Sequence, residues 1–440
     1  MQAHMVRMSQ WRSVLISGGL LLALSLAALA SHLFGVGMLP FVRGSRMGAY
    51  QRLWRALDRY YAYWDMAPVT PKDLKTRYDP EIAAADAACR GQSGPCQPYR
   101  QALTAMLAEL QDGHTRLVPL PPHALPPIAV REIEGRAAIV WVAPDSAAEA
   151  AGLTPGDIIV AVDGMPVADA LQRVPAWAIA FAAPHTRRYK AYANLLLGEP
   201  DSLVTLTVED AAGISREVTL RRQPLPKSTW QPVESRRLED GWGYIAVRTL
   251  QGGPGLVKAF DAALDNLLDT PGLILDLRSN GGGNSLWGER MVGRLITETM
   301  PYGEECFRAR HPMHRWVRGC HELRVTPRGK PYRGPVAVLL NPNVHSSAEW
   351  MAVALCTTGR ARCFGRTTAG NTGNPVPFYL PDATAYYSTG DFHLLDGSRL
   401  NGSGIRPHEI ITWTLEDIRA GHDPDLEAAR AWLKATLSQK

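Results

Sequence analysis

A buried apolar run that ends in a tight turn and two serines constrains the fold of this chain more than any other stretch. Residues 336–340 (Val-Ala-Val-Leu-Leu) have the composition of a buried strand, and Asn341-Pro342-Asn343 follows as a turn. Ser346 and Ser347 then open a helical pattern. A serine at such a turn lies where free backbone N–H groups and the positive end of the helix dipole stabilise an oxyanion. Taken alone, however, Ser346 is more simply interpreted as a helix N-cap.

A second stretch favours the interpretation of Ser346 as a nucleophile over its interpretation as an N-cap. Residues 273–277 (Leu-Ile-Leu-Asp-Leu) read as a buried strand, and a polar turn leads from them to Gly281, Gly282 and Gly283. Consecutive glycines let the backbone approach a ligand and direct N–H groups at an anion. We therefore expect the triplet to form the second half of an oxyanion hole, although a lone glycine triplet is more often a turn without a ligand.

Together the two stretches resemble the C-terminal-processing (tail-specific) serine protease family, which includes tricorn-type relatives. That family has an Asp-(Leu/Val)-Arg-x-Asn-x-Gly-Gly segment after one strand and a Ser-Ala-Ser-Glu-like helix start after a later strand. This chain has Ser346-Ser347-Ala348-Glu349 at the second position. The match implies that Ser346, three residues before Glu349, is the nucleophile. The resemblance covers most of the chain after about residue 50 and implies a crotonase-like catalytic core.

A serine nucleophile needs a general base, and the two branches of the family supply either a lysine or a histidine. The tail-specific branch uses a lysine 25 residues after the serine, but this chain has Asn371 there, and the lysine nearest to it in sequence is Lys330. The tricorn-like branch uses a histidine from an earlier turn, which corresponds to His114 in Asp112-Gly113-His114-Thr115. Histidine suits this role at neutral pH. His345 adjoins the serine and ranks second, because neighbouring residues of a strand point to opposite faces.

The resemblance also implies the remaining site residues. Asn401 stands where the tricorn-like branch has a glutamate that orients the histidine, and an amide oxygen can hold the required tautomer. The oxyanion hole is expected to use the backbone N–H of Ser347 and one N–H of the triplet, with Gly282 favoured. The predicted substrate-binding residues are Gly281, Gly283 and Asn371. No metal or organic cofactor is expected for this chemistry.

Composition places the chain among ordinary globular proteins. It has 440 residues, of which 46% are hydrophobic and 20% charged, so two or three domains are expected. The net charge is +5 without a long Lys/Arg block, which argues against nucleic acid as a partner. No zinc-type Cys/His spacing and no HExxH motif occurs.

The N-terminal 41 residues read as a signal anchor or signal peptide. Arg7 and Arg12 precede an apolar stretch over residues 14–41, and Ala28-Leu29-Ala30 has the form of a cleavage site. The stretch is also long enough to span a bilayer, which favours an uncleaved anchor. We therefore expect an exported protein, periplasmic or at the cell surface, tethered to the membrane by this segment.

The cysteines agree with export. The six residues form three locally spaced pairs, and an even count in an exported chain suggests disulfides. Local pairing is the simplest connectivity: Cys89 with Cys96, Cys306 with Cys320, and Cys356 with Cys363.

Three folded regions are expected after the anchor. Residues 45–118 read as a small helical domain, and five prolines over residues 119–127 mark its end. Residues 120–225 resemble a PDZ domain, because a short helix stopped at Gly152 leads into a Pro-Gly-Asp turn and a strand ending in Asp163-Gly164. PDZ-like modules bind extended peptides by adding a strand to a sheet edge. Residues 226–440 alternate strands and helices, as in an α/β domain.

The expected elements follow from hydrophobic periodicity. Strands are predicted at 137–142, 202–208, 218–220, 242–247, 273–277, 336–340 and 410–413, and residues 154–164 read as a turn, a strand and a second turn. Helices are predicted at 50–64, 98–110, 254–268, 285–296, 347–358 and 424–437, with a helical insertion at 166–198.

The sequence thus predicts a serine endopeptidase that hydrolyses peptide bonds of exported proteins or peptides, with a PDZ-like module that selects the substrate. A different class of function stays open. Asn371 and Asn401 replace residues that the family uses in catalysis, so the chain could instead be a weakly active or inactive binding protein on the same scaffold.

Overall fold

The computed structural model describes residues 45–92, 94–223, 231–309, 313 and 318–438. The predicted signal segment, residues 1–41, lies outside the described residues. Within the described part of the chain, no helix combines the length and apolar character needed to cross a membrane.

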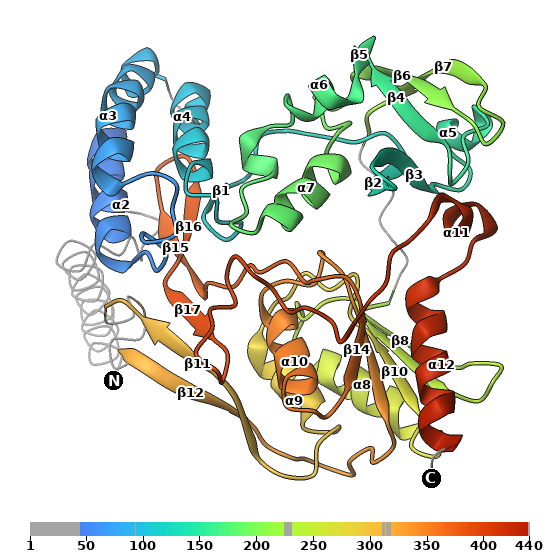
Figure 1. The fold of residues 1–440 in the computed structure, drawn as a ribbon. Coiled ribbons are helices and arrows are strands. Elements are labelled where there is room, and N and C mark those ends of the chain that lie inside the picture. Colours follow the sequence, from blue (N-terminus) through green and yellow to red (C-terminus); the bar gives the residue numbers. More distant parts are fainter. Residues whose placement is uncertain (1–44, 93, 224–230, 310–312, 314–317, 439–440) are drawn as a thin grey trace, which may run out of the picture.

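A six-stranded sheet forms the centre of the α/β core (Figure 1). Its strands, in spatial order, are β18 (Glu409–Ile410), β14 (Arg362–Gly365), β13 (Val336–Leu340), β10 (Leu273–Asp276), β9 (Gly243–Val247) and β8 (Val233–Arg237). All neighbours are parallel except β8 and β9. Because the carboxyl ends of parallel strands share one edge, the turns after β10 and β13 lie side by side.

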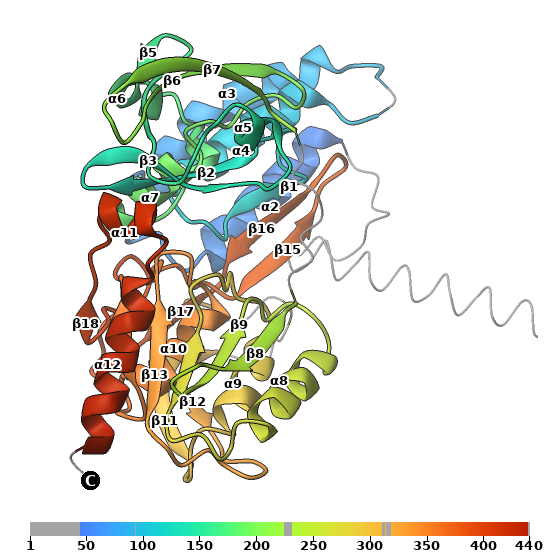
Figure 2. The same ribbon diagram turned by 90° about the vertical axis from the view of Figure 1, so that its right-hand side faces the viewer.

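Helices cover both faces of this sheet, which explains why its strands are apolar throughout. One face packs against α8 (Gly255–Asp265), α9 (Ser285–Val292) and α10 (Ser347–Cys356). The other face packs against α12 (Pro424–Ser438), which contributes Ala429 and Leu433 (Figure 2). Val338 and Leu340 face the first layer, whereas Ala337 and Leu339 face the second, as the two-residue period of a strand requires.

The PDZ-like region has a second sheet of order β2-β3-β4-β6-β7. Its strands are β2 (Ile128–Ile133), β3 (Arg136–Val142), β4 (Ile158–Val162), β6 (Leu203–Glu209) and β7 (Ser215–Arg221), with β5 (Met165–Pro166) paired to β4. Its helices are α5 (Ala147–Ala150), α6 (Val167–Leu171), the 3-10 turn η1 (Ala176–Ala178) and α7 (Pro184–Ala193). Gly152 ends α5 with a positive φ of 73°, as its position predicts.

The N-terminal helices share their core with a hairpin from the far end of the chain. The helices are α2 (Arg46–Tyr60), α3 (Pro71–Ala88) and α4 (Gln97–Ala108). The hairpin consists of β15 (Pro375–Tyr379) and β16 (Thr384–Ser388), and β1 (Arg116–Val118) pairs with β16. Phe378 and Tyr387 of the hairpin are buried among residues of the helices, such as Leu53 and Leu103. The domain boundaries given by the sequence remain predictions, and this contact crosses them.

Two further features complete the core. β11 (Met300–Phe307) pairs with β12 (Gly319–Val325) and β17 (Gly390–His393) in a three-stranded sheet that the sequence patterns did not indicate. The three predicted disulfides are confirmed: Cys89–Cys96, Cys306–Cys320 and Cys356–Cys363. The predicted α/β class, with a PDZ-like domain and N-terminal helices, is confirmed as well.

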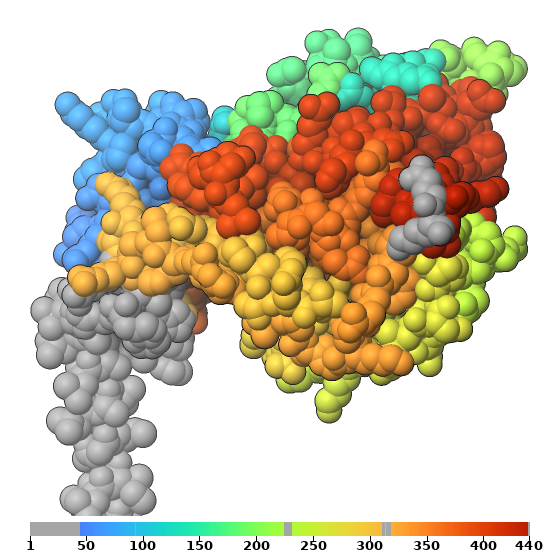
Figure 3. All heavy atoms as spheres, turned by 60° about the horizontal axis from the view of Figure 1, so that its bottom comes forward, coloured from blue at the N-terminus to red at the C-terminus, as the bar shows by residue number. Residues whose placement is uncertain are grey.

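The C-terminal segment returns to the PDZ-like sheet before the chain ends. Helix α11 (Leu415–Ala420) places Leu415 and Ile418 against Ile133, Ala138 and Ile158. A space-filling view shows this red segment running between the orange core and the green PDZ-like region (Figure 3). The last part of the chain therefore connects two regions that are far apart in the sequence.

Candidate active site

Ser346 occupies a strained turn between β13 and α10. Its backbone has φ 60° and ψ −134°, a conformation that costs a non-glycine residue about 1–3 kcal/mol and occurs mainly at functional sites. The turn is held by two backbone bonds, from Ser346 N–H to Asn371 O (3.0 Å) and from Glu349 N–H to Ser346 O (2.8 Å). The Ser346 hydroxyl makes no capping hydrogen bond. The N-cap interpretation therefore does not account for this serine.

The glycine triplet lies directly against this turn. Gly282 has φ 86°, and a Cβ there would lie 2.7 Å from the Cβ of Ser346 and 3.2 Å from the backbone nitrogen of Ser347. Gly283 has φ 146°, and its carbonyl accepts a hydrogen bond from the Ser347 hydroxyl (2.7 Å). Only glycine allows this approach, because any side chain at Gly282 would collide with the serine turn.

The expected oxyanion donor Gly282 is already engaged in this structure. Its N–H donates to Asn280 Oδ1 at 2.9 Å, and the buried Asn280 amide in turn donates to Val247 O. By contrast, the N–H groups of Ser347 and Gly283 have no hydrogen-bond partner among the described residues. The arrangement thus favours Gly283 over Gly282 as the second donor.

His114 lies in a firmly held turn between α4 and β1. Asp112 accepts the backbone N–H of His114 (3.0 Å) and the hydroxyls of Thr115 and Ser388 (2.6 Å each). The imidazole is only 6% exposed, and burial lowers the pKa of His114 while the Asp112 carboxylate partly opposes this. The side chain is therefore neutral at physiological pH, as a general base must be.

The structure brings the two turns together through Asn371 and His345. The Asn371 carbonyl accepts the Ser346 N–H, and its side chain faces the His114 imidazole. The rings of His114 and His345 stand edge to face with centroids 6.1 Å apart. Burial lowers the pKa of His345 well below its usual value, and His114 and Lys190 lower it further.

The predicted hydrogen-bond chain from Ser346 through His114 to Asn401 is not formed in this structure. Among the described residues, neither His114 Nδ1 nor Asn401 Oδ1 has a hydrogen-bond partner, although both atoms are buried. The Asn401 amide is directed at Met66 Sδ (3.9 Å) instead. The loops themselves are adjacent, since Gly402 N–H donates to Gly370 O (2.8 Å), one residue before Asn371.

Glu349 organises the loop that carries Asn371. This fully buried carboxylate accepts the Thr368 hydroxyl (2.5 Å) and the backbone N–H groups of Gly370 (2.8 Å) and Asn371 (2.9 Å). Burial raises the pKa of Glu349 to about 7, and these hydrogen bonds limit the rise. In the sequence, Glu349 is recognisable only as the last residue of the Ser346–Glu349 motif, and its partners on the later loop do not follow from spacing.

We expect Glu349→Gln to lower the melting temperature and the activity together. A glutamine has one acceptor oxygen, so its NH2 group would face a backbone N–H that the carboxylate now satisfies, at a cost of about 1–3 kcal/mol. Thermal unfolding of Glu349→Gln beside Glu239→Gln, a change at an exposed glutamate, measures the effect. Equal melting temperatures for both variants would contradict this role.

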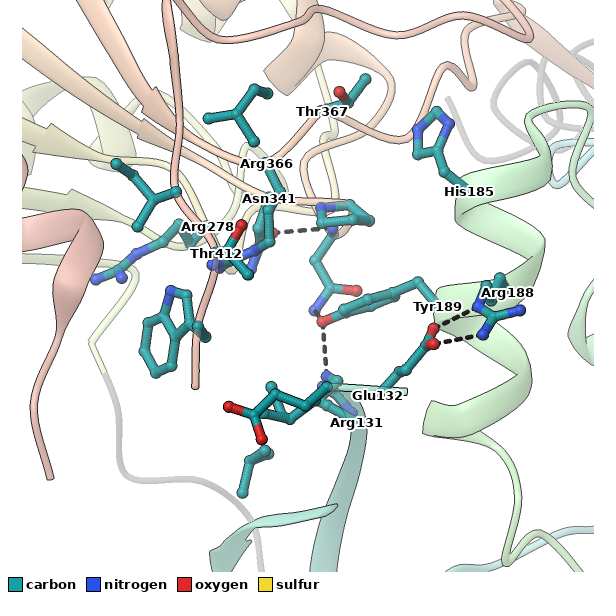
Figure 4. Close-up of a pocket in the computed structure, with 18 of the residues that line it drawn as sticks. Arg131, Glu132, His185, Arg188, Tyr189, Arg278, Asn341, Arg366, Thr367 and Thr412 are labelled. Carbon is teal, nitrogen blue, oxygen red and sulfur yellow. Dashed lines mark hydrogen bonds and ion pairs between the residues drawn. The ribbon is translucent and has the colours of Figure 1, made fainter. Parts of the chain in front are cut away.

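A cavity of about 610 Å³ lies between the PDZ-like sheet and the core. One wall carries Arg131 and Glu132 of β2 with Arg188 and Tyr189 of α7, and the other carries residues after β10, β13 and β14 such as Arg278 and Arg366 (Figure 4). β2 is the edge strand of its sheet, and α7 packs along it. The Arg188–Glu132 ion pair and the Arg131 Nε–Tyr189 OH bond (2.8 Å) link the strand to the helix.

Two segments of the chain match models of known protein families. Residues 241–411 match the model of peptidase family S41, and residues 139–178 match a PDZ domain. The core of this chain is therefore similar to the peptidases of family S41. The carboxy-terminal processing protease CtpA of Bacillus subtilis (strain 168) is 25% identical over 281 residues, which make up 63% of this chain and 54% of that protein. The chain thus matches only about half the length of that curated relative.

Two solved structures share the fold. Mature CPAF complexed with lactacystin superposes with a TM-score of 0.70 at 16% identity, over 89% of this chain and 98% of that chain. The photosystem II D1 C-terminal processing protease superposes with a TM-score of 0.51 at 21% identity, over 88% of this chain and 96% of that chain. Both therefore cover the N-terminal helices, the PDZ-like region and the core.

Proposed function

We propose that this chain is a serine-type endopeptidase that hydrolyses peptide bonds of exported proteins or peptides. The observation that carries the proposal is the strained Ser346 turn. Its hydroxyl is not used as a cap, and it lies beside two backbone N–H groups without partners in the described structure. A strained serine at a helix N-terminus is how a nucleophile is presented to a carbonyl group.

In the proposed reaction, Ser346 Oγ attacks the scissile carbonyl while His114 takes the hydroxyl proton. The oxyanion of the tetrahedral intermediate accepts hydrogen bonds from the N–H groups of Ser347 and Gly283. The C–N bond then breaks, and His114 returns the proton to the leaving amine. Water, deprotonated by His114, hydrolyses the acyl-enzyme and restores Ser346.

The proposed reacting conformation pairs His114 with Asn401. Their two buried partnerless atoms are complementary, since Nδ1–H is a donor and the amide oxygen an acceptor. We also infer that the cavity between the PDZ-like sheet and the core takes part in substrate selection, because a peptide could add to the edge strand β2 there. Export is supported by the three disulfides, which persist in oxidising compartments.

The experiment that tests the proposal is covalent labelling of the folded protein with a fluorophosphonate probe, followed by proteolysis of an unfolded protein substrate. Labelling at Ser346 together with cleavage of the substrate is the expected result. A non-catalytic binding protein is the second candidate, favoured by the unformed bond between His114 and Asn401. Folded protein that takes up no probe and leaves the substrate intact would favour that candidate.

Asn401→Ala is expected to lower kcat by about 10- to 100-fold with little change in KM, because the imidazole would lose the group that orients it in the reacting state. Steady-state kinetics on a peptide substrate measure both parameters. Ser403→Ala, a change at a neighbouring exposed residue, is the control. A kcat for Asn401→Ala equal to that of the control would remove Asn401 from the mechanism.

A further inference from the structure

Lys190 reaches from helix α7 of the PDZ-like region to the turn that precedes Ser346. Its Nζ donates to Asn343 Oδ1 at 2.9 Å and lies 5.6 Å from the ring centre of Phe181. Among the described residues, no carboxylate forms an ion pair with it. A half-buried ammonium group with a single hydrogen bond has two donors left for a ligand.

This position lies between the histidine turn and the serine turn. Phe181, beside Lys190, packs on the histidine turn so closely that a Cβ on Gly113 would lie 2.5 Å from its ring. Asn343, on the other side, is three residues before Ser346. An anion bound at Lys190 would thus be close to the scissile bond.

Helix α7 is held in this position by contacts between its side chains and the loop at residues 368–369. Thr186 Oγ1 donates to Ala369 O (2.8 Å), and His185 Nε2 lies 2.7 Å from Thr368 O. These contacts attach the helix to the loop whose next residues meet Ser346 and His114. Lys190 is therefore held at a defined distance from the site, as a specificity residue must be.

The charges around Lys190 are positive. Burial, with a contribution from Arg131, lowers the pKa of Lys190 to about 8, so the amine is still mostly charged at pH 7. Arg131 and Arg116 also form no ion pair with any described residue. Arg116 lowers the pKa of both His114 and His345. The Asp112 carboxylate, which raises the pKa of His114, is occupied by hydrogen bonds from its own turn and from the Ser388 hydroxyl. Three cations without carboxylate partners produce a field that attracts an anion.

We propose that Lys190 is a specificity-determining residue that binds a carboxylate of the peptide substrate near the scissile bond. The carboxylate is either an Asp or Glu side chain or the free C-terminus of the peptide. The inference rests on the proposed peptidase function, because it concerns the substrate of that site. It assigns to the PDZ-like region a direct contact with the part of the substrate that reacts.

The test uses four matched peptides that contain Asp or isosteric Asn next to the cleaved bond and end in a carboxylate or an amide. We expect the wild-type kcat/KM to favour one acidic form over its neutral partner by about 10- to 100-fold, the range of a charge-assisted hydrogen bond. The Asp/Asn arm and the acid/amide arm show which carboxylate is bound. Lys190→Met is expected to bring that ratio to about 1, and Lys190→Arg to retain most of it.

Lys258→Met, a change at an exposed lysine of α8, is the matched control and should keep the wild-type ratio. A wild-type protein with no preference in either arm, or a preference that survives in Lys190→Met, overturns the proposal. It is also overturned if folded Lys190→Met loses turnover of all four peptides and labelling of Ser346, because Lys190 would then act in catalysis itself.

A binding arm separates this inference from the proposed function. Fluorescence anisotropy measures the affinity of the same four peptides for Ser346→Ala, which needs no catalysis. Tighter binding of an acidic form that is lost in Ser346→Ala/Lys190→Met supports the role of Lys190 even if the wild type hydrolyses nothing. Equal affinity for all four peptides contradicts it.

Discussion

Ser346→Ala is expected to reduce peptide hydrolysis by on the order of 10⁴-fold or more, because it removes the nucleophile and leaves only the oxyanion donors and binding groups. The fluorophosphonate adduct should disappear as well. Alanine keeps the backbone bonds that hold the turn, from Ser346 N–H to Asn371 O and from Glu349 N–H to Ser346 O. The fold should therefore survive, and the loss should appear in kcat/KM and in labelling rather than in melting temperature.

Ser215→Ala provides the control, because this serine is exposed on β7, in the PDZ-like sheet. It should be labelled and should hydrolyse peptides like the wild type. Retained activity in folded Ser346→Ala, or an adduct mapped by mass spectrometry to Ser347, would refute the assignment of the nucleophile.

His114→Gln is the second change with a large expected effect, a loss of about 10⁴-fold in kcat, because the serine hydroxyl would have no base. Glutamine retains a side chain able to donate and accept hydrogen bonds, so the buried turn should stay folded. His345→Gln should cause a smaller loss. If the effects of the two changes are reversed, His345 is the base and the order of preference between the two histidines is wrong.

The pH profile gives an independent check on His114. In the proposed mechanism the neutral imidazole is the active form, and burial lowers the pKa of His114 below 6.5. Activity should therefore persist below pH 6.5 and fall as the pH drops through that lowered value. Glu349 titrates near pH 7, so the profile is repeated in Glu349→Gln. An acid limb that remains in this variant belongs to the histidine, whereas a limb centred above 6.5 in both proteins would contradict the assignment.

Local sequence patterns predicted the features that depend on neighbouring residues. The apolar run before Asn341-Pro342-Asn343 became β13, and the strand before the glycine triplet became β10. Cysteines 7 and 14 residues apart pair with each other, because short loops bring their ends together easily. The position of Ser346 at a helix start was predicted for the same reason.

Contacts between distant segments were not accessible in this way. The role of Lys190 depends on how α7 lies on the loop after β14, which neither periodicity nor motif spacing encodes. The contacts of Asn371 with the His114 imidazole and with the Ser346 N–H, for example, do not follow from its place in the sequence. The direction in which the Asn401 amide points is decided by Met66, 335 residues earlier in the chain. Side-chain orientations of this kind depend on tertiary packing.

The way in which α11 covers the PDZ-like sheet has a practical consequence for domain transplantation. If residues 120–225 were excised and fused to another protein, the sheet would lose the cover of Leu415 and Ile418. Ile133, Ala138 and Ile158 would then form an exposed apolar patch that promotes aggregation. A transplanted module would therefore have to bring along the distant C-terminal helix or carry polar replacements on that face. These two pieces of the chain are therefore one structural unit, although nearly two hundred residues separate them.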